Sequence, residues 1–155
     1  MTQNTVQSGY ATRPAVAYAG MPADMHGWDA DTGIAEGNIG FGLAASRGSA
    51  DNGLLVGGAT FKGITIRDIT LVHDTADRYE TGDNVGLMNR GDIWVAVATD
   101  VVNDKQAYYN SSTGAIGAST ISNAVAIAGA IFLDTVASGG FSRVRLSNGI
   151  GDTTT

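Results

Sequence analysis

The chain has 155 residues and a formal net charge of -6, from nine Lys and Arg and fifteen Asp and Glu residues. That length fits one domain that buries roughly 70% of its unfolded surface. The basic residues are scattered singly, which argues against a nucleic-acid partner because phosphate binding requires clustered cations. The chain contains no cysteine, so disulfides and thiolate metal sites are excluded. The polar start and the longest apolar run, residues 124–133, which is about half a membrane span, predict a soluble cytoplasmic product and no membrane partner.

Residues 1–36 differ from the rest of the chain. They contain both prolines, Pro14 and Pro22, and show no regular apolar period. Proline favours extended backbone and cannot donate to a β ladder. We therefore expect an extended N-terminal arm over 1–36 and a β-rich body over 37–155.

Short apolar runs separated by Gly, Asn and Asp predict a series of β strands from residue 39 onward. The expected strands are 39–45, 53–57, 62–72, 84–88, 92–101, 105–110, 129–136 and 141–147. The turn-forming residues at 89–92 and 103–105 are expected to close antiparallel hairpins. An all-β fold follows, either a small β-barrel or a jelly-roll-like sandwich.

Three segments have a less regular pattern. The apolar phase changes near Arg67 and again near Ser142, which predicts a β-bulge or a strand that changes sheets. Residues 119–128 are the only plausible helix, with a loop containing one short turn as the alternative.

The predicted strand at 92–101 is apolar on both faces. Residues Ile93, Val95 and Val97 alternate with Trp94, Ala96 and Ala98. A strand with one solvated face would alternate apolar and polar residues. This strand is therefore expected either in the centre of a sandwich or against a second protein.

No group of residues in the sequence completes a catalytic or metal site. The groups considered were His26 and His73, the calcium-loop-like 29–33, the GxGxxA pattern at 40–45, and the acidic series Asp74, Asp77, Glu80 and Asp83. Each has a simpler structural interpretation: turn histidines, an Asx turn, close strand packing and a solvated loop. Arg143 and Arg145, on one strand face, are expected to be solvated or ion-paired. We predict no enzyme activity and no cofactor.

Three segments together resemble a known family: TRPAVAYAGMPAD (12–24), YETGDNVGLMNRGDIWVAVATDVVNDKQAYYNSSTGAI (79–116) and GAIFLDTVASGGFSRVRLSN (129–148). They are similar to the capsid cement, or head decoration, proteins of tailed bacteriophages. The resemblance implies a β-barrel or jelly-roll-like homo-oligomer, a dimer or a trimer. It also implies that this oligomer is made in the host cytoplasm and sits on the outer surface of the head, where it clamps copies of the major capsid protein.

Interface energy in such a protein is expected to concentrate in a few aromatic or Arg side chains. The candidates are Tyr10, Arg13, Tyr18 and Trp28 on the arm and Trp94 on the body, with core packing as the alternative for Trp94. A different function, a carbohydrate-binding or adhesin-like β-sandwich, would use Trp28, Tyr79, Tyr108 and Tyr109 to stack on sugars. A hydrolase built on the acidic loops is a third and weaker hypothesis.

Overall fold

The computed structural model describes residues 17–24, 27–71 and 78–147. Every regular element in this part of the chain is a β strand, which confirms the all-β prediction. The strands are β1 (Asp29–Ala35), β2 (Ile39–Gly40), β3 (Ala44–Arg47), β4 (Gly53–Val56), β5 (Phe61–Thr65), β6 (Arg78–Tyr79), β7 (Asn84–Ala96), β8 (Gln106–Asn110), β9 (Ile116–Gly117), β10 (Ala124–Phe132) and β11 (Phe141–Leu146). No helix in the described residues is long and apolar enough to cross a bilayer.

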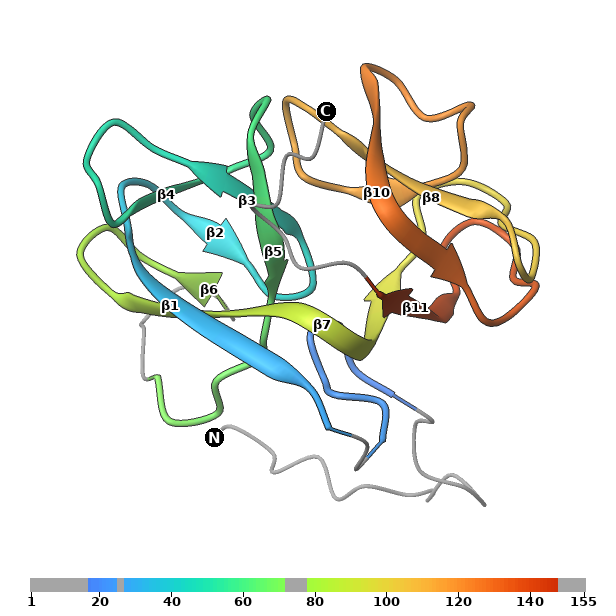
Figure 1. The fold of residues 1–155 in the computed structure, drawn as a ribbon, viewed down its shortest axis with the longest axis horizontal. Helices are drawn as coiled ribbons and strands as arrows, with labels where there is room; N and C mark the ends of the chain where they lie inside the picture. Colours follow the sequence, from blue (N-terminus) through green and yellow to red (C-terminus); the bar gives the residue numbers. More distant parts are fainter. Residues whose placement is uncertain (1–16, 25–26, 72–77, 148–155) are drawn as a thin grey trace, which may run out of the picture.

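The first half of the fold is a closed barrel. Its strands pair in the order β1-β4-β3-β5-β7, and β1 also pairs with β7, so the ring has no open edge between those two strands. Closing a ring in this way removes the unpaired edges that an open sheet leaves. The short sheet of β2 and β6 lies within the outline of this ring in Figure 1, and its Ile39 and Tyr79 are buried in the same core as the barrel strands.

The second half extends from the same long strand. The sheet continues β7-β11-β10-β8-β9, and Ile116 of β9 returns to pair with Val97, just past the end of β7. Figure 1 shows the two halves side by side, with β7 running across both. The small barrel that the sequence predicts is therefore present, with a second set of strands built onto it.

Strand β7 joins two regions that the sequence assigns to separate strands. The predicted turn at residues 89–92 is wrong, because these residues lie inside β7. Asp29 pairs with Arg90 and Ala30 with Met88, which leaves Asn89 as the extra residue of a β-bulge. The chain then bends at Gly91, whose φ is 125°. Turn-forming residues here bend a strand instead of ending it.

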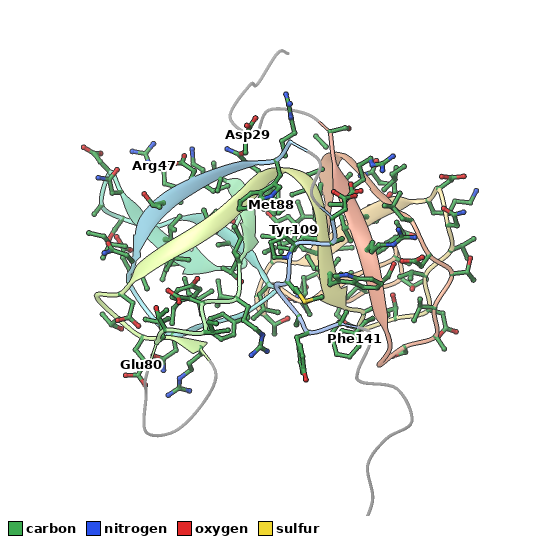
Figure 2. The ribbon with its side chains drawn as sticks, turned by 90° about the horizontal axis from the view of Figure 1, so that it is seen from below. Asp29, Arg47, Glu80, Met88, Tyr109 and Phe141 are labelled. Carbon is green, nitrogen blue, oxygen red and sulfur yellow. The ribbon has the colours of Figure 1, made fainter. Side chains whose placement is uncertain are left out.

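Strand β7 lines two hydrophobic cores. Before the bulge, Val85 and Leu87 belong to the core inside the barrel. Met88, just before the bulge, and Ile93 and Val95, after it, belong to a second core. That core lies between the barrel strands β3 and β5, through Ala44 and Ile64, and the second half. In Figure 2, Met88 and Tyr109 lie between the strands, whereas Asp29 and Phe141 lie at opposite edges.

Several other expectations about local structure are corrected. Residues 124–132 form strand β10 and no helix occurs at 119–128. The apolar phase does not change at Ser142, because Phe141 is exposed while Ser142, Val144 and Leu146 are buried on one face of β11. The turn at 103–105 leads to β8, which pairs with β10 and β9 and not with β7. Strand β5 ends at Thr65, before the predicted change at Arg67.

The segment assigned to the arm contributes directly to the body. Its residues 29–35 form β1 of the barrel. Residues 20–23 also run along β7: Gly20 N–H donates to Trp94 O at 2.8 Å, and Trp94 N–H donates to Met21 O at 2.9 Å. Pro22 bridges to Ile93. Residues 1–16, which include Tyr10 and Arg13, lie outside the described part of the chain.

We predict that Gly91 is the least replaceable glycine of β7. An alanine Cβ at this position would overlap the Cβ of Trp28 and would adopt a strained φ. We expect Gly91→Ala to lower the free energy of unfolding by about 3 kcal/mol or more. Gly82→Ala is the matched control, because Gly82 has a φ of 93° but no atom within 4 Å of the added Cβ. It should cost about 1–2 kcal/mol from strain alone. Equal losses in denaturant unfolding would contradict this account.

Candidate functional site

The residues that point away from the core on β7 and β11 form one continuous surface, which we call the outer face. Ala96 pairs with Phe141, Trp94 with Arg143 and Asp92 with Arg145 across the two strands. Phe141 is 42% exposed, Ala96 and Ala98 are exposed, and Trp94 is half-buried. The outer face is therefore apolar at one end and charged at the other. The sequence prediction of an apolar outer face holds from Trp94 to Ala98.

The guanidinium of Arg143 forms a two-pronged ion pair with Asp134 on this face. Arg143 Nε and Nη2 donate to the two carboxylate oxygens at 3.0 and 2.8 Å, and the backbone N–H of Arg143 donates to Asp134 Oδ2 at 3.0 Å. The side-chain hydrogen bonds from Arg143 lower the pKa of the Asp134 carboxyl, although partial burial opposes this effect. The same bonds raise the pKa of Arg143. Both groups stay charged near neutral pH and neutralise each other.

Arg145 forms a second pair of the same type with Asp92. Arg145 Nε and Nη2 donate to Asp92 Oδ1 and Oδ2 at 2.9 and 3.0 Å. The hydrogen bonds to Asp92 raise the pKa of Arg145. Only 7% of Asp92 is exposed, so its carboxylate depends on Arg145 for the partner that water would otherwise supply. Both arginines are ion-paired, as the sequence predicts.

Trp94 lies between these charges and the apolar end of the outer face. The guanidinium carbon of Arg143 is 5.8 Å from the centroid of the Trp94 ring, which is within cation–π range. The backbone of Trp94 is fixed by its hydrogen bonds to Gly20 and Met21. Of the two alternatives predicted for Trp94, the structure places its ring on the outer face and not in either buried core.

Tyr18 forms a separate exposed group with the loop after β5. Tyr18 is 56% exposed, and the guanidinium of Arg67 lies 5.5 Å from its ring centroid and 4.8 Å from that of Phe41. Two residues further on, Ile69 is 89% exposed. The flanking Asp68 carboxylate accepts hydrogen bonds from the N–H and the hydroxyl of Thr70, which lower the pKa of Asp68. This ordered turn holds a large apolar side chain in the solvent.

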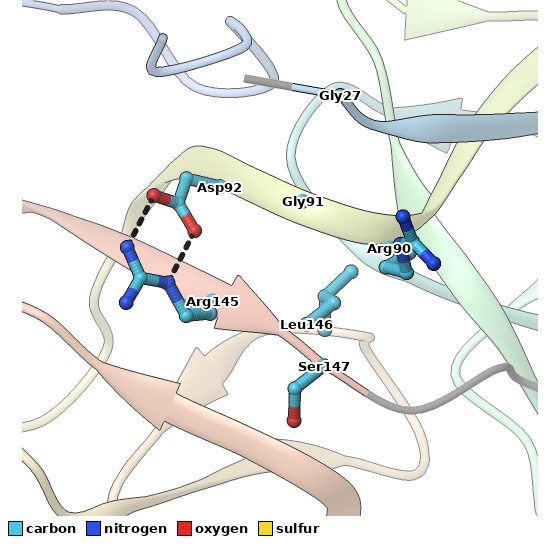
Figure 3. Close-up of a pocket in the computed structure, with 7 residues that line it drawn as sticks. All are labelled: Gly27, Arg90, Gly91, Asp92, Arg145, Leu146 and Ser147. Atoms are coloured by element: carbon cyan, nitrogen blue, oxygen red, sulfur yellow. Dashed lines mark hydrogen bonds and ion pairs between the residues drawn. The ribbon is translucent and has the colours of Figure 1, made fainter.

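Trp28 lies at the bend of β7. It is 40% exposed, and its Cβ packs on Gly91. Beside it is a groove of about 330 Å³ where β1 begins and β11 ends (Figure 3). The groove is lined by Gly27, Arg90, Gly91, Asp92, Arg145, Leu146 and Ser147. Arg90 pairs with Asp29 at 3.5 Å, so each arginine in the groove has an acidic partner.

Two of the four aromatic residues considered for sugar stacking are buried. Tyr79 is 1% exposed and donates its hydroxyl to Ile66 O, and burial raises its pKa. Tyr109 is fully buried and donates to Gly58 O at 2.8 Å. Neither ring can stack on a ligand from solution. The carbohydrate-binding arrangement predicted from the sequence is therefore not assembled.

The other candidate groups also have structural roles or lie outside the description. Asp31 lies in β1 and accepts a hydrogen bond from Thr32 N–H at 2.8 Å. Gly42, in the GxGxxA pattern, has a φ of 69° and packs closely on the backbone of Gly20, as the close-packing interpretation predicts. Within the described ranges, no three His, Asp or Glu residues are grouped to hold a metal ion. The residues His26, His73, Asp74 and Asp77 lie outside these ranges.

The ion pair between Asp134 and Arg143 predicts a pH-dependent contribution to stability. Because the folded-state pKa of Asp134 is lowered, the stabilisation is complete above the unfolded value of about 3.9 and is lost as pH falls through the folded value. We expect Asp134→Asn to cost up to about 1 kcal/mol near neutral pH, since both side chains are partly exposed. The difference from the unmodified chain should shrink below about pH 4. Asp104→Asn, at a turn where Asn tolerates the φ of 65°, is the control. A difference that grows in acid would contradict the prediction.

Comparison with solved structures shows that this fold occurs elsewhere. A chain of "The capsid of Myoviridae Phage XM1" superposes with a TM-score of 0.75 at 16% identity, and the match covers 94% of this chain and 99% of that one. The head fibre gp8.5 N base of bacteriophage phi29 matches with a TM-score of 0.49 at 11% identity, over 77% of this chain and 94% of that one. At these identities the first likeness shows the fold alone, and the second supports no argument.

Comparison of the sequence with family models gives a clearer result. No curated protein sequence matches the chain. The model described as "Structural cement protein (E217 gp24/Pam3 gp6)" matches residues 6–147, which include every strand of the described residues, β1 to β11. The chain therefore belongs to the phage structural cement protein family.

Proposed function

We propose that the chain decorates the outer surface of a tailed-phage head, where it binds the major capsid protein and other copies of itself. The family match over residues 6–147 is the observation that carries this proposal. The likeness in fold to a chain from the capsid of phage XM1 agrees with it. A cement protein strengthens a shell by adding contacts between subunits, and many modest contacts repeated by symmetry give a large total.

Exposed aromatic side chains on the arm and near the bend of β7 support a contact with capsid protein. Tyr18 and Trp28 each present a large exposed ring, and Ile69 adds an exposed apolar side chain two residues after Arg67. Such residues supply most of the energy in protein interfaces. We propose Tyr18 and Trp28, together with Tyr10 and Arg13 from residues 1–16, as capsid-contacting residues.

The proposed role is structural and requires no catalysis. The family is described as structural, which supports a non-enzymatic function. The charged groups on the outer face are paired with each other, which suits a stable contact surface more than acid–base chemistry.

The capsid contact can be tested with heads that lack their cement protein. We expect Tyr18→Ala and Trp28→Ala each to weaken binding to such heads by about tenfold or more, which corresponds to about 1.4 kcal/mol. Leu55→Ala is the matched control for Trp28→Ala, because Leu55 is 41% exposed on β4. Co-sedimentation of purified variants with heads measures the effect.

A truncation tests the contribution of the arm. A chain that begins at Ala17 keeps β1 and the segment on β7, whereas removal of residues 1–36 would delete a barrel strand. We expect the chain from Ala17 to fold with an unchanged circular dichroism spectrum and to bind heads more weakly. Unchanged binding by this truncation would exclude Tyr10 and Arg13 as contacts. Unchanged binding by all the variants would exclude the arm surface.

A further inference from the structure

We propose that Arg67 positions Tyr18 for its contact with the capsid protein and does not itself make that contact. The inference rests on the proposed function, because it takes Tyr18 as a capsid-contacting residue. It goes further by naming a residue from the barrel, outside the arm, and the way in which that residue acts.

The backbone of Arg67 joins the arm to the barrel. Arg67 lies just past the end of β5, and its N–H donates to Gly20 O at 2.8 Å. The N–H of Gly20 donates in turn to Trp94 O at 2.8 Å. Gly20 has a φ of 83°, and a Cβ there would lie 2.8 Å from Arg67 N, so this close approach requires glycine. The arm is therefore held at Gly20 by both the loop after β5 and β7.

The side chain of Arg67 holds two further residues of the arm. Its Nε donates to Ala19 O at 3.2 Å. Its guanidinium carbon lies 5.5 Å from the ring centroid of Tyr18 and 4.8 Å from that of Phe41, both within cation–π range. The buried Phe41 packs edge-on against the buried Tyr79, with ring centroids 5.1 Å apart. Arg67 therefore connects the exposed ring of Tyr18 to an aromatic pair whose position is fixed by the core.

This connection matters for binding because Tyr18 is exposed. The N–H of Met21 donates to Tyr18 O at 3.1 Å, which orders the backbone of Tyr18 but not its ring. An exposed aromatic side chain loses rotational freedom when a partner immobilises it, and this loss reduces affinity. A guanidinium already in contact with the ring limits that freedom before binding. Arg67 thus raises the affinity of the Tyr18 contact without adding contact area.

The positioning requires arginine and not merely a positive charge. A lysine at this position keeps the charge but lacks the Nε donor and the planar group that stacks on rings. Arg67→Lys is therefore the informative variant. Arg47→Lys is the matched control, because Arg47 ends β3, its side chain is 55% exposed, and its partner is Asp51.

The first test measures the ring of Tyr18 in the absence of heads. The chain is labelled with 3-fluorotyrosine, and the fluorine NMR line of Tyr18 is identified by its loss in Tyr18→Phe. We expect Arg67→Lys to move this line toward that of free 3-fluorotyrosine, because the contact with the guanidinium is lost. The line of the buried Tyr109 should stay in place, which shows that the fold is kept. Arg47→Lys should move neither line.

The second test is a double-mutant cycle on binding to heads that lack their cement protein. We expect Arg67→Lys to weaken binding by about threefold or more when Tyr18 is present, and by less than about twofold in the Tyr18→Ala chain. The effect shrinks because a residue that acts through Tyr18 has nothing left to position. An arginine that touched the capsid protein directly would lose the same affinity in both chains.

Four results would overturn the proposal. They are an unmoved Tyr18 line in Arg67→Lys, a Tyr109 line that moves as far as the Tyr18 line, equal losses of head affinity with and without Tyr18, and equal effects of Arg67→Lys and Arg47→Lys. Failure of the proposed function is distinguishable. It appears as an absence of head binding by the unmodified chain, whereas the fluorine spectrum is recorded without heads.

Discussion

The bend of β7 at Gly91 is the constraint on which the rest of the structure depends. A single strand passes from the barrel to the second half and contributes residues to both cores, with Asn89 as the extra residue of its bulge. Gly91 adopts a φ of 125° against the Cβ of Trp28. A Cβ at this position would lie 2.4 Å from the Cβ of Trp28 and 3.2 Å from Met88 Sδ, so the backbone beside β1 or the Met88 side chain would have to shift.

The same bend determines what the molecule presents to a partner. Residues 20–23 pair with β7 just beyond the bend, and Trp28 packs on the bend itself. The exposed aromatic side chains of the arm therefore sit on a backbone that the body already orders. Backbone that is already hydrogen-bonded, as at Tyr18 O and residues 20–23, does not have to be ordered when a partner binds, which is an advantage for an interface built from small contacts.

Much of the fold could be predicted from alternation and turn residues. The all-β class and most strands from residue 39 onward follow from local patterns, and so does the apolar outer face at Trp94, Ala96 and Ala98. The errors arise where tertiary pairing overrides local preference. The residues at 89–92 have typical turn chemistry, but partners on both β1 and β11 keep them in a strand. Residues 124–128 have a composition open to a helix, yet they pair with β8.

The candidate site was less predictable than the fold. The sequence identifies Trp94, Tyr18 and Trp28 by residue type, but the exposure of Phe141 and Ile69 depends on strand phase and on a turn held by Asp68. The pairing of Arg143 with Asp134 spans a loop and that of Arg145 with Asp92 spans more than fifty residues, so sequence spacing could not show it. Burial of Tyr79 and Tyr109, which removes them from any sugar-binding surface, also required the three-dimensional packing.

An electron cryomicroscopy reconstruction of phage heads saturated with the chain tests the central claim most directly. The account predicts density for the barrel on the outer surface of the shell, with Tyr18 and Trp28 directed toward the capsid protein. Heads without added density, or copies bound with both Tyr18 and Trp28 in solvent, would contradict it.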